Sequence, residues 1–81
     1  MLEEIRTLLG DVLQLGERTH TLNADSPLMG SLPELDSMAV VGVITAIEEN
    51  YDFIVDFDEV SAETFSTLGT LTAFVEQKIS E

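Results

Sequence analysis

Apolar residues at helical spacing constrain the fold of this chain more than any other feature of its sequence. Leucine, isoleucine and valine recur three and four positions apart between residues 2 and 13, which is the stripe of an amphipathic helix. A second such stripe runs from Leu68 to Ile79. Between them, the stretch from Met38 to Glu48 carries no charge before its last residue, and its pattern continues to Tyr51. Because that is too long for one buried strand, the spacing predicts a third long helix there.

Local signals set the ends of these helices. The first is expected over residues 2–15, with two glutamates in its first turn, where the helix dipole favours acids, and with Gly16 as a stop. The middle helix is expected over residues 37–51, with Asp36 as its N-cap and Gly42 as a weak point of about 1 kcal/mol relative to alanine. Its inward stripe is expected to comprise Met38, Val41, Ile44 or Thr45, Ile47 or Glu48, and Tyr51.

The remaining segments are expected to be connections and one short helix. Residues 17–36 are rich in turn residues and predict a long loop, whose scattered leucines would hold it against the core. Residues 61–65 predict a short helix capped by Ser61, and Ser66 or Thr67 would cap the last helix. The expected fold is an all-α four-helix bundle, with three long helices and one short, in a single domain of residues 1–81. The expected core residues are Leu8, Val12, Val40, Ile44, Ile47, Phe53, Phe65, Leu68, Leu71 and Phe74.

The net charge of the chain limits the classes of partner that it can bind. Three basic residues face sixteen acidic ones, for a net charge of -13. Such a surface repels nucleic-acid phosphates and anionic lipid headgroups, and it attracts basic proteins. No apolar run approaches the roughly 20 residues of a membrane-spanning helix, and the first residues are acidic where a secretory signal would be basic. We therefore expect a soluble, unprocessed protein that binds no nucleic acid and does not insert stably into membranes.

The sequence lacks the residue patterns that a catalytic site or a metal site needs. A serine nucleophile needs a nearby base, and the one histidine, His20, lies in the predicted loop without a nucleophile motif around it. The chain has no cysteine, and one histidine cannot build a histidine-based zinc site. The acidic stretch from Asp52 to Glu59 fails as an EF-hand, because Phe57 stands where that loop requires glycine. We expect neither an enzyme nor a dedicated metal site.

Ser37 stands out because Asp36 already supplies the helix cap. Its hydroxyl is then free at the start of a helix, where unpaired N–H groups and the dipole favour an anion. A phosphate ester at Ser37 would therefore be well placed. The apolar helix that follows could line a groove or interior for a hydrophobic group.

These residues resemble a known family. The chain is similar to the acyl carrier proteins, including their peptidyl and aryl carrier relatives, over almost its full length. The resemblance rests on LDSM at the start of the middle helix, AIEENYDF at its end, and the tail TFSTLGTLTAFVEQKI. In that family the serine of an Asp-Ser-Leu motif bears 4′-phosphopantetheine, which a dedicated transferase installs from coenzyme A. The resemblance implies that Ser37 is the attachment residue, with Met38 where leucine is usual.

The resemblance also implies a function. It predicts a cytoplasmic, monomeric carrier that holds acyl groups as thioesters on the thiol of the cofactor. The carrier would deliver these groups to enzymes of lipid, polyketide or related specialised biosynthesis, including fatty acid biosynthesis. The implied partners are a phosphopantetheinyl transferase and acyl ligases, transferases or synthases with basic docking patches. Asp36, Met38, Glu48 and Glu49 are the expected docking residues, although a solvated helix face explains the two glutamates equally well.

Three residues depart from the commoner family pattern. Ala39 and Gly42 stand where carriers of primary fatty acid synthesis have acids, and Pro33 interrupts the run before the motif. These changes alter the surface nearest Ser37 and favour a specialised carrier with its own ligase or transferase. The alternative is an acidic helical protein–protein interaction module without a covalent cofactor, in which Ser37 serves only at the helix start.

Overall fold

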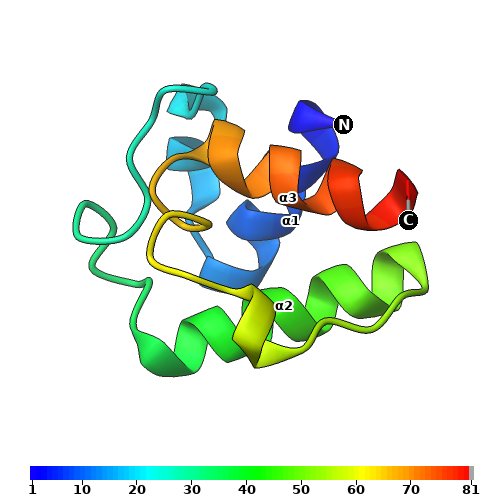
Figure 1. Ribbon diagram of the computed structural model, residues 1–81. Helices are drawn as coiled ribbons and strands as arrows, with labels where there is room; N and C mark the ends of the chain where they lie inside the picture. The colour runs from blue at the N-terminus through cyan, green and yellow to red at the C-terminus, as the bar shows by residue number, and fades with distance from the viewer. Residues whose placement is uncertain (81) are drawn as a thin grey trace.

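The computed structural model describes residues 1–80, which form helices and turns (Figure 1). The helices in chain order are α1 (Leu2–Leu13), the 3-10 helix η1 (Gly16–Thr21), α2 (Ser37–Tyr51), the 3-10 helix η2 (Phe57–Glu59) and α3 (Leu68–Ser80). The helix α1 packs against both α2 and α3. The predicted all-α class is confirmed, and the three long helices lie where the apolar spacing places them.

The end of α1 differs from the prediction. The helix stops at Leu13 rather than at residue 15, because Gln14 adopts the left-handed conformation with φ 55°. The Gln14 N–H donates to the carbonyl of Gly10 and closes the last turn. Gly16, with φ 61°, then redirects the chain into η1, so the first part of the predicted loop is helical.

The predicted short helix at residues 61–65 is wrong in position. Its residues form successive turns, with the N–H of Thr64 donating to Ser61 and that of Ser66 donating to Glu63. The Thr64 hydroxyl accepts the N–H of Ser61 at 3.2 Å, and such local side-chain bonds compete with regular helix formation. The short helical element instead lies a few residues earlier, as η2.

The core is shared by the three long helices and the connections. Leu8, Ile44, Ile47, Phe65, Leu68 and Leu71 are buried as predicted, whereas Val12, Val40, Phe53 and Phe74 are only partly buried. The predicted inward stripe of α2 is wrong at its start, since Met38 is 80% exposed and Val41 is 44% exposed. Apolar residues surround almost the whole first half of α2, so their spacing does not select a face. Packing buries Val43, Ile44 and Ile47 instead.

The long connection before α2 is fastened to the start of α3. Leu28 and Met29 donate their N–H groups to the carbonyls of Ser66 and Phe65, each at 3.0 Å, and Gly69 donates to Ala24 at 2.8 Å. The side chain of Leu28 is fully buried. Figure 1 shows this connection running along one side of the three helices before it enters α2. The predicted docking of the loop on the core is confirmed.

A threonine pair begins α3. The Thr67 hydroxyl accepts the N–H of Thr70 at 3.1 Å, and the Thr70 hydroxyl accepts the N–H of Thr67 at 3.0 Å. This reciprocal arrangement satisfies two backbone donors at the helix start. Thr67, rather than Ser66, is therefore the cap. No helix within residues 1–80 combines the length and the apolar character that a membrane span needs.

Candidate functional site

Ser37 is the first residue of α2 and is exposed to solvent. Asp36, immediately before it, adopts an extended backbone, and its Oδ1 accepts the N–H of Ala39 at 2.8 Å. This is the predicted N-cap, and it satisfies a donor that the helix itself leaves unpaired. Because Asp36 caps the helix, the Ser37 hydroxyl is not needed as a cap. The Ser37 hydroxyl has no hydrogen bond within residues 1–80.

The surroundings of this hydroxyl suit a phosphate ester. The N–H groups of Ser37 and Met38 lie at the positive end of a fifteen-residue helix and have no backbone acceptor within residues 1–80. Free amides at a helix start are favourable neighbours for an anion. The hydroxyl is also accessible to a modifying protein. The residues present therefore fit a phosphodiester-linked group at Ser37.

The surface beside Ser37 is apolar rather than charged. Met38 and Val41 lie largely exposed on the outer face of α2, and no acid lies in its first turn. The surface beside Ser37 thus presents exposed apolar side chains, with the carboxylate of Asp36 next to the serine.

The two glutamates predicted for docking occupy different environments. Glu48 is half-buried, and its Oε2 accepts the N–H of Val55 at 2.8 Å. Glu49 is exposed, and its side chain has no hydrogen bond within residues 1–80. Both lie at the far end of α2, about 16.5 Å (Glu48) and about 18 Å (Glu49) along the helix axis from Ser37 at about 1.5 Å per residue. The structure thus brings Asp36, Ser37 and Met38 together and keeps the glutamates apart from them.

The other residues that could serve catalysis or metal binding do not lie close together. His20 lies exposed in η1. Within residues 1–80, no three histidine, cysteine or acidic side chains gather closely enough to hold a metal ion. In the acidic stretch from Asp52 to Glu59, Glu59 accepts the Asp56 N–H and pairs with Lys78 at 2.9 Å. These contacts lower the pKa of Glu59, with the Lys78 bond as the largest cause.

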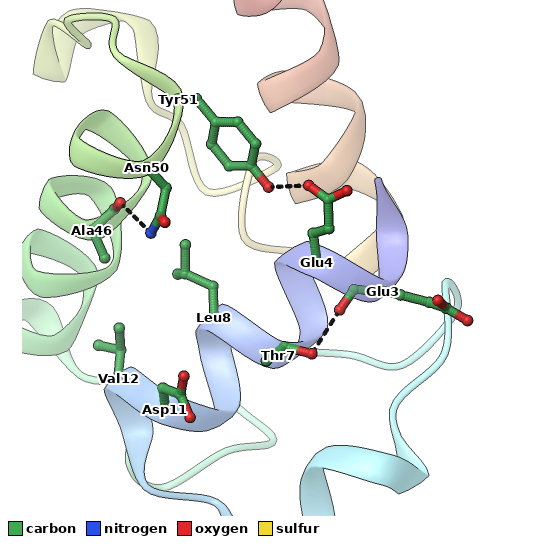
Figure 2. A pocket seen from close by; sticks show the side chains of 9 residues that line it. All are labelled: Glu3, Glu4, Thr7, Leu8, Asp11, Val12, Ala46, Asn50 and Tyr51. Atoms are coloured by element: carbon green, nitrogen blue, oxygen red, sulfur yellow. Dashed lines mark hydrogen bonds between the residues drawn. The ribbon is translucent and has the colours of Figure 1, made fainter.

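A groove between α1 and α2 is a feature that sequence reasoning missed. Its volume is about 660 Å³, and Figure 2 shows Leu8 of α1 pointing into it toward α2. At one end the Tyr51 hydroxyl donates to Oε2 of Glu4 at 3.0 Å. Partial burial raises the pKa of Tyr51, and this hydrogen bond raises it further. The helical register of Glu4, Leu8 and Asp11 on one face was the available signal.

Comparison with known proteins agrees with this geometry. The profile of the family described as "Phosphopantetheine attachment site" matches residues 3–75. Among solved structures, the chain is similar to a holo acyl carrier protein from Nitrosomonas europaea, determined by NMR in solution. The two are 66% identical, the match covers 99% of this chain and 96% of the other, and the TM-score is 0.91. No curated protein matches the chain.

Proposed function

Since this chain belongs to the acyl carrier proteins, we propose that Ser37 is the residue that bears its 4′-phosphopantetheine. The observation that carries the proposal is an exposed, unbonded hydroxyl at the start of α2, beside an aspartate that supplies the cap in its place. The protein is a carrier and not a catalyst, so its serine needs no base of its own. The bound group supplies a terminal thiol that holds acyl groups as thioesters.

Attachment requires the Ser37 oxygen to reach a phosphorus atom. That oxygen forms a new P–O bond to the pantetheine phosphate of coenzyme A, the pyrophosphate bond breaks, and adenosine bisphosphate leaves. The serine proton passes to a base of the transferase, because within residues 1–80 no hydrogen-bond acceptor holds the Ser37 hydroxyl. The N–H groups of Ser37 and Met38, which have no backbone acceptor within residues 1–80, would favour the negative charge of a phosphate ester at this helix start.

We propose that the whole chain acts as one monomeric carrier domain in the cytoplasm. It would deliver acyl groups to enzymes of lipid, polyketide or related specialised biosynthesis, including fatty acid synthesis. Met38 and Val41 are exposed and apolar, and Ala39 and Gly42 are uncharged where carriers of primary fatty acid synthesis have acids. These differences support a specialised acyl carrier protein. Its partners would meet an apolar surface near Ser37 and would meet the charge of Glu49 farther along α2.

The direct test is transfer of phosphopantetheine from coenzyme A. The purified apo chain, incubated with coenzyme A, magnesium and a broad-specificity phosphopantetheinyl transferase, should gain the mass of one phosphopantetheine. The Ser37→Ala variant should gain none. Ser31→Ala, which removes another exposed serine in the preceding loop, should be modified as the unaltered chain is. Modification that persists in Ser37→Ala would refute the assignment.

The alternative is an acidic helical interaction module that never carries the cofactor. It accounts for the charge of -13 and for the helices, but it gives the free hydroxyl of Ser37 no task. The intact mass of the protein isolated from its own cells separates the two functions. A population wholly without the added group would favour the interaction module.

A further inference from the structure

The groove between α1 and α2 combines an apolar floor with acidic ends. Leu8 is buried at its floor, with Val12 and Ala46 partly buried beside it. Glu4 and Asp11 line the same groove from α1. They lie seven residues apart on one helix face, which is about 10.5 Å along the axis. Figure 2 shows Leu8 between these two carboxylates along the helix.

The carboxylates of this groove have no counterion within the described chain. Arg18 pairs with Glu34, Lys78 pairs with Glu59, and Arg6 donates to the carbonyl of Leu22 at 3.3 Å. All three basic side chains of the sequence are therefore engaged away from the groove. Since no basic side chain of residues 1–80 pairs with the groove carboxylates, we expect the complementary cations to come from another molecule.

The position of Asp11 adds to this argument. It lies in the last turn of α1, where the negative end of the helix dipole disfavours a carboxylate, and that turn contains no basic residue. The Asp11 carboxylate also has no hydrogen-bond or ion-pair partner within residues 1–80. Its charge therefore costs stability and gains nothing inside the molecule. Binding of a cationic partner would offset that cost.

We propose that this groove docks a basic amphipathic helix of a partner protein. Two lysine or arginine side chains about two turns apart would meet Glu4 and Asp11, and an apolar side chain between them would pack on Leu8. The Tyr51 hydroxyl holds the Glu4 carboxylate at the groove through Oε2, and Oε1 is left for the partner.

This docking face is separate from the start of α2. The α2 residues that line the groove, Ala46, Asn50 and Tyr51, begin about 13.5 Å along the helix from Ser37. A partner in the groove would therefore leave Ser37 open to a second protein. The inference does not rest on the proposed function of Ser37, and it assigns the groove to tethering the carrier rather than to handling its cargo.

The test uses a synthetic peptide and the full chain labelled with nitrogen-15. The peptide is an amphipathic helix with two lysines seven residues apart and leucines at the third and fourth positions between them. Titration followed by NMR should shift the amides of Leu8, Asp11, Ala46 and Asn50, and leave those of Ser37 and Met38 unmoved. The Ser37→Ala variant should bind the peptide as the unaltered chain does, which keeps this test independent of the cofactor.

Matched variants separate docking from general attraction to an acidic surface. The double variant Glu4→Gln/Asp11→Asn keeps an acceptor for the Tyr51 hydroxyl and removes two charges, and we expect its affinity to fall about fivefold. The control Asp58→Asn/Glu63→Gln removes two exposed charges elsewhere and should leave the affinity unchanged. Equal losses in both double variants, shifts centred on Met38 and Val41, or no binding would overturn the proposal. Saturation of the same amides by magnesium alone, with no further effect of the peptide, would overturn it as well.

Discussion

The Glu48 carboxylate accepts the backbone N–H of Val55, with 2.8 Å between Oε2 and the nitrogen. This bond joins the last turn of α2 to the chain that follows it, because the helix ends at Tyr51 and Asp52 turns the chain in the left-handed conformation. Glu49, the next residue, is exposed and makes no such contact within residues 1–80. Of these two adjacent acids, Glu48 thus stabilises the fold, whereas the Glu49 side chain is accessible at the surface.

Substitution of these two glutamates should separate their roles. Glu48→Ala leaves the Val55 N–H, which is partly buried, without an acceptor and should lower the free energy of unfolding by about 1 kcal/mol. Glu48→Gln keeps an acceptor oxygen and should lose less. Glu49→Ala should change stability by no more than about 0.5 kcal/mol. Urea unfolding measures all three, and an equal effect of Glu48→Ala and Glu49→Ala would contradict the structural role of Glu48.

The same pair shows what sequence can and cannot predict here. Periodicity and capping residues located the three long helices and the Asp36 cap, because both signals are local. They did not show that Glu48 folds back onto Val55, since that contact depends on a left-handed turn at Asp52. Nor did they orient α2, whose first half is apolar on most sides. The groove beside Tyr51 was missed because it exists only once two helices pack together.

Replacing the glycine of α1 or that of α2 by alanine should change the stability of the protein in opposite directions. A Cβ at Gly10 would collide with the Thr19 side chain, whose Cγ2 would be 2.6 Å away, so Gly10→Ala should destabilise by about 1–3 kcal/mol. A Cβ at Gly42 would meet only Val12 Cγ1, at 3.7 Å, which is an ordinary contact. Gly42→Ala should therefore stabilise by up to about 1 kcal/mol through helix propensity. Thermal unfolding distinguishes the two variants, and stabilisation by Gly10→Ala would contradict the close packing of η1 on α1.

Added salt should stabilise the folded chain. The net charge of -13 repels itself, and the Debye length shortens from about 30 Å at 0.01 M salt to about 3 Å at 1 M. Salt also weakens the pairs Arg18–Glu34 and Lys78–Glu59, but ion pairs at the protein surface contribute little to stability. The repulsion is the larger effect, so Tm should rise along a sodium chloride series. A Tm that falls would show that the ion pairs dominate, and a constant Tm would equally contradict the prediction.

Loss of the Glu59–Lys78 pair at low pH gives a second electrostatic prediction. The Lys78 ammonium, followed by the Asp56 N–H, lowers the pKa of Glu59 below its ordinary value of 4.5. A carboxyl whose pKa is lowered by folding stabilises the protein above its unfolded pKa and ceases to do so as pH falls through the folded pKa. Glu59→Gln should therefore be less stable than the unaltered chain at neutral pH, and the difference should vanish in strong acid. In a Lys78→Met background, most of this pH dependence should disappear.

Asp36 has two tasks that substitution can separate, namely capping α2 and presenting a charge beside Ser37. Asp36→Asn keeps an acceptor for the Ala39 N–H, and asparagine caps helices about as well as aspartate, so stability should hold within a few tenths of a kcal/mol. Asp36→Ala loses the cap and should cost about 1 kcal/mol. If a basic transferase reads the charge, both variants should be modified at Ser37 more slowly than the unaltered chain, as followed by intact mass. Modification of Asp36→Asn at the full rate would mean that Asp36 assists Ser37 only by setting the start of the helix.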